Sequence, residues 1–179
     1  MTTAYLALGS NLGDRLVALR AAVQALATRP ELRIDLAHDV SSLYESSPIG
    51  GSSDQPPYLN SALCVRTSLT PSALLATVLS IEDSLGRTRR VRWGPRVVDI
   101  DLLFVGDVVL DTPTLTLPHP RLHDRRFVLE PLSELAADLI HPLIGVSIGT
   151  LTQCLRRDRR SDTVIRIQGP GWVLHPPPG

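Results

Sequence analysis

The sequence predicts an α+β fold in which strands and helices follow the order β-α-β-β-α-β. Two patterns support this prediction: short apolar runs typical of buried strands, and longer segments with apolar residues three and four positions apart, typical of amphipathic helices. The chain has 179 residues, and 43% of them are hydrophobic, so it can bury the core of one globular domain.

The first half of the pattern ends near residue 45. Residues 3–9 form an apolar run typical of a strand, and we interpret residues 9–13 as the turn that follows. The next segment has the apolar spacing of a helix up to Pro30. Residues 33–45 are predicted to form the second strand.

The second half contains the best-marked helix. After a third predicted strand at residues 59–67, Thr70 can cap a helix, Pro71 suits its first position and Gly86 suits its end. A fourth strand is predicted over residues 97–105. This order is the split βαβ arrangement of ferredoxin-like folds.

The C-terminal part adds further elements to this core. We expect a short strand at 108–110, one or two short helices between 127 and 157, and a short strand at 163–168. The predicted architecture is therefore a ferredoxin-like βαββαβ core with extra C-terminal helices and a short strand. Residues 1–168 are expected to form a single domain, and 169–179 a tail rich in Pro and Gly that is partly disordered.

Composition excludes several kinds of phosphate chemistry. All 18 basic residues are arginine, whereas a Walker A loop, a protein-kinase site and a Schiff-base enzyme each need a lysine. A protein of this composition that handles phosphates must use arginines, backbone amides and metal ions. The formal net charge of zero also argues against a general nucleic-acid-binding surface.

Membrane and redox chemistry are not indicated either. No apolar run approaches the roughly 20 residues that a membrane-spanning helix needs, and the N-terminus begins with a strand-like run rather than a targeting segment, so we expect a cytoplasmic protein. The two cysteines, Cys64 and Cys154, lack the spacing of metal ligands. They are predicted to be buried thiols without chemical function.

The sharpest chemical feature is the pair Asp99 and Asp101 on the fourth predicted strand. Side chains alternate between the faces of a strand, so both carboxylates are expected on one face and Ile100 on the other. Two neighbouring carboxylates suit a site for Mg²⁺. The alternative is a solvated strand face without function.

A loop rich in arginine comes directly before this strand. Guanidinium groups bind phosphate oxygens in a planar, two-pronged way, and a triphosphate needs cations opposite its metal ion. The alternative is a basic loop paired with its acidic neighbours. The arginines are Arg87, Arg89, Arg90, Arg92 and Arg96.

Two further groups could bind a flat polar ligand. Tyr58 and Asn60 share a face of the third predicted strand, where a ring and an amide could stack on a heterocycle and read its edge, although a core tyrosine and a strand-end asparagine are the alternative. Pro118 and Pro120 make helix unfavourable around residue 119. We interpret this segment as a rigid loop that presents His119 and Arg125 to a polar ligand and Phe127 to a flat one.

Four motifs, taken together and in this order, resemble the 6-hydroxymethyl-7,8-dihydropterin pyrophosphokinase (HPPK) family over roughly residues 3–155. They are ALGSNLG at residues 7–13, YLN at 58–60, RWGPR with DID at 92–101, and LPHP leading to RRF at 117–127. The resemblance implies a ferredoxin-like fold, usually monomeric, in which ATP and a pterin meet across the central sheet. The implied enzyme is an ATP-dependent pyrophosphokinase of folate synthesis. It transfers pyrophosphate from ATP to the hydroxymethyl group of 6-hydroxymethyl-7,8-dihydropterin and releases AMP.

The resemblance also implies roles for individual residues. Asp99 and Asp101 would hold two Mg²⁺ ions, and Arg87 and Arg96 would act with them in catalysis. ATP, the co-substrate, would contact Glu82, Arg89, Arg92, Trp93, Ile100, Thr116, His119 and Arg125. The pterin would contact Ser46, Ser47, Ile49, Tyr58, Asn60 and Phe127. The division of labour among Arg89, Arg90 and Arg92 stays open.

Two other functions compete with this expectation. An RNA-binding module can share the βαββαβ order, but it needs aromatic residues where this chain has Asp99 and Asp101, and only 4% of the residues are aromatic. A pseudoenzyme that binds ATP or pterin without turnover is the second. The expected partners are therefore the small-molecule substrates, with no nucleic acid and no membrane, and the expected state is a monomer.

Overall fold

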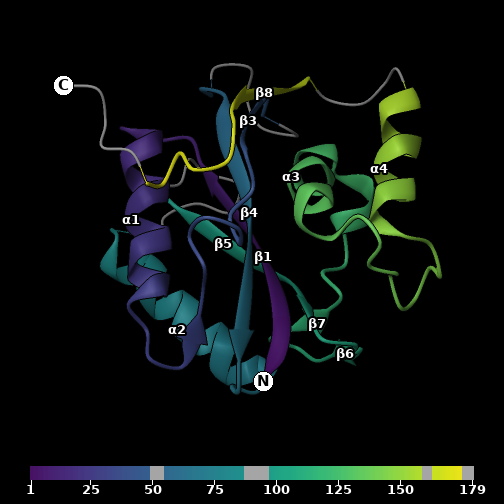
Figure 1. Ribbon diagram of the computed structural model, residues 1–179, viewed down its shortest axis with the longest axis horizontal. Helices are drawn as coiled ribbons and strands as arrows, with labels where there is room; N and C mark the ends of the chain where they lie inside the picture. The colour runs from purple at the N-terminus through teal and green to yellow at the C-terminus, as the bar shows by residue number, and fades with distance from the viewer. Residues whose placement is uncertain (49–54, 87–96, 159–162, 175–179) are drawn as a thin grey trace.

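The computed structural model describes residues 1–48, 55–86, 97–158 and 163–174. Its centre is an antiparallel sheet whose strands differ in length (Figure 1). The strands run side by side in the order β5-β1-β4-β3-β8, and the short β2 pairs with the end of β4. Their bounds are β1 Thr2–Ser10, β2 Leu32–Arg33, β3 Leu43–Ser46, β4 Tyr58–Thr67, β5 Asp99–Val105 and β8 Val164–Gln168. The order β5-β1-β4-β3 with its two connecting helices is the predicted ferredoxin-like arrangement.

Helices cover both faces of this sheet (Figure 1). Helices α1 and α2 lie on one face, and α3 and α4 lie on the other, beyond the short 3₁₀ turn at Leu122–Asp124. A separate two-stranded ribbon, β6 with β7, follows β5. The bounds are α1 Arg15–Ala27, α2 Pro71–Ser84, α3 Arg126–Ala136, α4 Ile148–Arg157, β6 Leu110–Asp111 and β7 Thr116–Leu117.

Local sequence explains where α1 and α2 begin. Asp14 accepts a hydrogen bond from the Val17 amide through its side chain and caps α1. Thr70 caps α2 in the same way through the Ala73 amide, and Pro71 occupies the first helical turn, as predicted. Gly86 follows α2 with a φ of 90°, the left-handed conformation that ends many helices.

Two hydrophobic clusters form the core, one on each face of the sheet. The larger packs α1 and α2 against the sheet, with Leu6, Leu19 and Ile81 almost fully buried. The smaller packs α3 and α4 against the opposite face around Phe104 and Leu129. A cavity also lies on the α3 side of the sheet, lined by residues of the strands, of α3 and of the segment that leads into α3.

Helices α3 and α4 are joined by a buried acidic residue. Glu130 of α3 is 3% exposed and accepts hydrogen bonds from Arg126, one turn away, and from Arg156 of α4. Burial acts to raise the Glu130 pKa, but the hydrogen bonds from Arg156 and Arg126 outweigh burial, so the pKa is lowered. This ion-pair cluster fixes α4 against α3.

The segment after β8 returns to the opposite face and packs on α1. Trp172 is fully buried, its indole nitrogen donates to the Ser41 carbonyl over 2.8 Å, and its own carbonyl accepts two hydrogen bonds from Arg20. The sequence predicted a tail from residue 169 onward. Residues 169–174 are instead part of the packed structure, and residues 175–179 lie outside the described residues.

Several predicted elements need correction. The single strand expected over 33–45 is two short strands, β2 and β3, because Asp35 and Asp39 form side-chain hydrogen bonds to nearby backbone amides that favour turns. The turn expected over 9–13 begins only after Ser10, since Gly9 lies within β1. The short strand expected at 108–110 is β6, at Leu110–Asp111.

The cysteine prediction was also wrong in part. Both cysteines are free thiols, but Cys154 is exposed on α4 and Cys64 is only partly buried. In the part of the chain that the structure describes, no helix is long and apolar enough to cross a membrane.

Candidate active site

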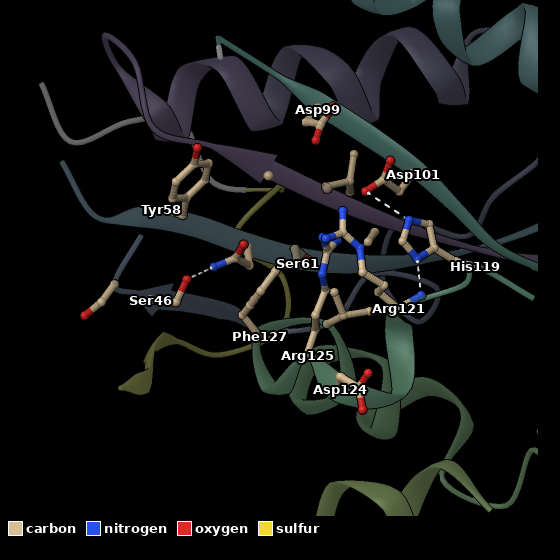
Figure 2. A pocket seen from close by; sticks show the side chains of 16 residues that line it. Ser46, Tyr58, Ser61, Asp99, Asp101, His119, Arg121, Asp124, Arg125 and Phe127 are labelled. Carbon is tan, nitrogen blue, oxygen red and sulfur yellow. Dashed lines mark hydrogen bonds and ion pairs between the residues drawn. The ribbon is translucent and has the colours of Figure 1, made fainter. Parts of the chain in front are cut away.

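A cavity of about 660 Å³ opens on the α3 side of the sheet (Figure 2). Its floor is formed by β1, β4 and β5, and its wall by the segment that leads into α3. Nine of the predicted site residues with described side chains line it. They are Ser46, Ser47, Tyr58, Asn60, Asp99, Asp101 and Phe127, and the wall adds His119 and Arg125.

A second, smaller cavity of about 300 Å³ adjoins the first. It lies between α2, β5 and the ribbon segment 112–116, and Leu75 and Leu79 give it an apolar side. The predicted residues Glu82, Ile100, Thr116 and His119 line it. Asp99, Asp101 and His119 line both cavities, so two carboxylates stand at the boundary between them.

The two carboxylates point to the cavity face of β5, as the alternation predicted. Ile100 and Leu102, between and after them, are buried in the larger cluster on the other face. In β1, Gly9 pairs with Asp99 and Ala7 with Asp101. Both partners are small, which leaves space above the carboxylates.

A β-bulge next to Asp101 helps to hold the neighbouring loop. The register between β1 and β5 shifts at Leu103, and the Leu103 carbonyl accepts a hydrogen bond from the His119 amide over 3.0 Å. The peptide bond between Leu117 and Pro118 is cis. The hydrogen bond to the Leu103 carbonyl holds the His119 backbone beside β5, and the His119 Nε2 atom lies 3.9 Å from Asp101 Oδ2.

His119 is a neutral imidazole at physiological pH. Burial, reinforced by the charges of Arg125 and Arg121, lowers its pKa to about 4, although Asp99 acts in the opposite direction. Its Nδ1 atom accepts a hydrogen bond from the Arg121 amide, so its Nε2 atom carries the proton. The contact with Asp101 is therefore between a neutral N–H group and a carboxylate, not an ion pair.

Arg125 brings positive charge to the same wall. Burial and the nearby Arg121 charge lower the pKa of its guanidinium, while Asp101 and Asp99 act to raise it. The guanidinium also lies over the Phe127 ring, 5.7 Å from its centre. Figure 2 shows Arg121 and Arg125 on the wall that faces the two aspartates.

The other end of the larger cavity presents two aromatic rings and an amide. Tyr58 and Phe127 come from β4 and α3 and line it together (Figure 2). Asn60 is 4% exposed, and its amide nitrogen donates to Ser46 Oγ over 2.9 Å. Two aromatic rings and an oriented amide can stack on a heterocycle and read its hydrogen-bonding edge.

The donor set also fits Mg²⁺. Among the described residues no cluster of three or more His, Cys, Asp or Glu side chains could hold a metal ion by itself. Mg²⁺ is commonly bound by one or two carboxylates together with substrate phosphates and water, rather than by a complete protein cage. Asp99 and Asp101, with Asp101 about 40% exposed to the cavity, meet that requirement.

Some predicted residues cannot be placed, and some lining residues were not predicted. The predictions for Ile49, Arg87, Arg89, Arg92, Trp93 and Arg96 fall outside the described residues. Gly9, Ser61, Arg121, Asp124 and Val128 line the larger cavity without having been predicted. Gly9 could have been predicted from sequence, because side chains alternate along β1 and Gly9 therefore lies on the same face of the strand as Ala7. Ser61 lies in β4, and the other three belong to α3 or to the segment that leads into it, so they depend on how α3 docks.

Paired carboxylates and arginines beside a cavity are the groups with which enzymes transfer phosphoryl groups with the help of metal ions. The family model of 7,8-dihydro-6-hydroxymethylpterin-pyrophosphokinase (HPPK) matches residues 5–137. The chain therefore belongs to the HPPK family.

Curated relatives agree with this assignment. The chain is 47% identical over 132 residues to the 2-amino-4-hydroxy-6-hydroxymethyldihydropteridine pyrophosphokinase of Bacillus subtilis (strain 168), covering 74% of this chain and 77% of that protein. It is 46% identical over 140 residues to the protein of the same name from Methylorubrum extorquens, covering 78% and 86%.

Solved structures support the fold. A crystal structure of Plasmodium falciparum HPPK-DHPS superposes with a TM-score of 0.63 at 16% identity, and a triple mutant of that protein gives 0.67 at 15%. These matches cover 86% and 89% of this chain. The chain spans only 43% and 44% of those longer proteins, so the likeness concerns the HPPK fold alone.

Proposed function

We propose that the two adjoining cavities bind the pterin and ATP, and that Asp99 and Asp101 mark the place where the substrates react. The HPPK family transfers pyrophosphate from ATP to 6-hydroxymethyl-7,8-dihydropterin in folate biosynthesis, and this chain is an ATP-dependent pyrophosphokinase of that family. The observation that carries the proposal is the position of the two carboxylates, which line both cavities.

The pterin takes the end of the larger cavity between Tyr58 and Phe127. Stacking between two rings suits a flat heterocycle. The Asn60 amide, oriented by Ser46, reads the polar edge of the ring, and Ser47 lines the same end. With its edge held there, the hydroxymethyl group of the substrate extends toward the carboxylates of β5.

The nucleotide enters from the smaller cavity. Leu75, Leu79 and Ile100 offer an apolar surface for a base, and Thr116 offers a hydroxyl group. Glu82 is 1% exposed, and its Oε1 accepts a hydrogen bond from the Ile100 amide over 2.7 Å, which fixes the strand beneath the base. The phosphates then lie toward His119 and Arg125.

Asp99 and Asp101 hold the Mg²⁺ that accompanies ATP, and two ions are proposed. A metal ion held by these carboxylates would neutralise phosphate charge and make the phosphorus more electrophilic. The neutral His119 can donate its Nε2 hydrogen to a phosphate oxygen, and Arg125 balances negative charge on the leaving side. Arg87 and Arg96 are proposed to act with them in the transfer, and Arg89, Arg92 and Trp93 to contact ATP.

The hydroxymethyl oxygen attacks the β-phosphorus of ATP and releases its proton to water, and the bond from that phosphorus to the α-phosphate oxygen breaks. Pyrophosphate thus moves intact, and AMP leaves with the bridging oxygen. Ile49 is proposed to complete the pterin site. We further propose a monomer that acts on small molecules without nucleic acid, in the cytoplasm, where an enzyme that consumes ATP is expected.

Steady-state kinetics with variants from the two cavities would test this assignment. Tyr58→Ala should raise the KM for the pterin and leave the KM for ATP close to the wild-type value, because Tyr58 lines only the larger cavity. Leu75→Asn, which alters only the smaller cavity, should do the reverse. If both variants raised the same KM, the assignment of the cavities would be wrong.

A further inference from the structure

Gly9 occupies the middle of the cavity floor. It lies in β1 between the other two strands of the floor, paired with Asn60 of β4 on one side and with Asp99 of β5 on the other. Residues paired across neighbouring strands present their side chains on the same face. Asn60, Gly9 and Asp99 therefore form a row across the floor, and the central position has no side chain.

This row connects the two chemical ends of the cavity. Neighbouring strands are about 4.8 Å apart, so the outer members of the row are separated by roughly 10 Å. At one end, the Asn60 amide donates to Ser46; at the other, Asp99 adjoins the smaller cavity. A ligand held by Asn60 and reacting beside Asp99 must cross Gly9.

The backbone does not explain a glycine here. Gly9 lacks the positive φ that favours glycine in turns, and it sits inside a regular strand, where glycine is less stable than alanine. Internal packing does not explain it either. Among the described residues, a β-carbon at Gly9 would meet only Asn60 Oδ1, at 3.8 Å, which is an ordinary van der Waals distance.

We propose that Gly9 determines specificity by keeping the cavity floor open for the pterin. The absent side chain lets the heterocycle and its hydroxymethyl arm lie close to the sheet while they span from Asn60 to Asp99. The preceding cavity-side residue of β1, Ala7, is also small and lines the same cavity. This inference rests on the proposed placement of the pterin in the larger cavity.

The test is a size series at this position. Gly9→Ala and Gly9→Val would be compared with the wild type for thermal unfolding, for the KM of each substrate, and for binding of 6-hydroxymethyl-7,8-dihydropterin by calorimetry in the presence of Mg²⁺ and a non-hydrolysable ATP analogue. Gly169→Ala is the matched control. It is not among the residues that line either cavity, and among the described residues its new β-carbon would meet only the end of the flexible Arg166 side chain.

Gly9→Ala should unfold at the wild-type temperature or above it. The affinity of Gly9→Ala for the pterin should fall by roughly tenfold or more, because the added methyl group would overlap sterically with the bound heterocycle. Gly9→Val, with a larger side chain, should bind the pterin still more weakly. The KM of Gly9→Ala for ATP should stay close to the wild-type value, and Gly169→Ala should behave as the wild type in every assay.

Two results would overturn the inference. One is a folded Gly9→Ala protein that binds the pterin as the wild type does. The other is a fall in unfolding temperature that accompanies the loss of binding, which would give Gly9 a structural role instead. A wild-type protein that forms no AMP would count against the proposed reaction, whatever the series shows.

Discussion

Asn60 donates a hydrogen bond from its amide nitrogen to Ser46 Oγ over 2.9 Å, and the two residues lie on the neighbouring strands β4 and β3. This bond fixes which end of the amide meets a ligand. The oxygen, Oδ1, lies toward Gly9 and the middle of the cavity floor, because a β-carbon on Gly9 would be 3.8 Å from it. The geometry thus presents an acceptor to a heterocycle that carries N–H groups at its edge.

Loss of this oriented amide should weaken binding of the pterin and leave binding of ATP almost unchanged. We expect Asn60→Ala to reduce kcat/KM for the pterin by about 10- to 100-fold, the value of one or two hydrogen bonds to a buried ligand, with little change in the KM for ATP. Ser46→Ala should have a smaller effect in the same direction, because the amide remains but can rotate. An equal effect of Asn60→Ala on both substrates would contradict this reading.

The carboxylates of β5 should be essential for turnover. Asp99→Ala and Asp101→Ala are each expected to lower kcat by roughly 10²- to 10⁴-fold, since several kcal/mol of charge stabilisation would be lost. Calorimetry should also show that Mg²⁺ no longer strengthens binding of an ATP analogue. Asp107→Ala, in the exposed turn after β5, is the matched control and should be fully active.

The ion-pair cluster at Glu130 should make stability depend on acid pH. The pKa of Glu130 is lowered in the folded protein, so the unfolded chain takes up a proton first as the pH falls. The contribution is complete well above the ordinary glutamate pKa of about 4.3 and is lost as the pH falls through the lower folded value.

Thermal unfolding of Glu130→Gln against pH would measure that contribution. At pH 7 we expect a loss of about 1–3 kcal/mol, less than for a fully buried pair because Arg156 is about half exposed. The gap from the wild type should narrow below about pH 4, where Glu130 of the unfolded wild-type chain takes up its proton while the folded carboxylate is still ionised. Glu31→Gln serves as the control. If the difference in unfolding free energy between the wild type and Glu130→Gln grew as the pH fell, the Glu130 pKa would be raised in the folded protein rather than lowered.

Trp172 should be one of the strongest single contributors to stability. Replacement by alanine removes a fully buried indole and its hydrogen bond to Ser41, at a cost of about 3–5 kcal/mol. Trp172→Phe keeps most of the packing and should cost less. Leu174→Ala, at a half-exposed neighbour, should have little effect in the same denaturant titration. A mild effect of Trp172→Ala would mean that residues 169–174 are dispensable.

The sequence predicted those elements whose signals are local. Helix α2 carries its own cap at Thr70 and Pro71, and the alternation of β5 correctly placed Asp99 and Asp101 on one face. The region 33–45 was predicted wrongly because its apolar content resembles a strand. The turn-forming hydrogen bonds of Asp35 and Asp39 depend on where each side chain points.

Features that depend on distant packing could not be predicted. The stretch around Trp172 has a composition typical of a disordered tail, yet its indole fills a space between α1 and the sheet that exists only after folding. Glu130 gave no signal either, because its partner Arg156 lies on another helix. In the site, Tyr58, Asn60 and the two aspartates were identified from sequence as lining candidates, whereas Arg121 and Asp124 enter the cavity only through the way α3 docks.

The central claim is that this chain moves pyrophosphate intact from ATP to the pterin. A ³¹P NMR time course with ATP, Mg²⁺ and 6-hydroxymethyl-7,8-dihydropterin tests it most directly, with Asp101→Ala run in parallel. We predict that AMP and a pterin diphosphate ester appear together at equal rates with the wild type and not with the variant. The appearance of ADP, or the absence of any change that depends on the pterin in a folded wild-type protein, would contradict the account.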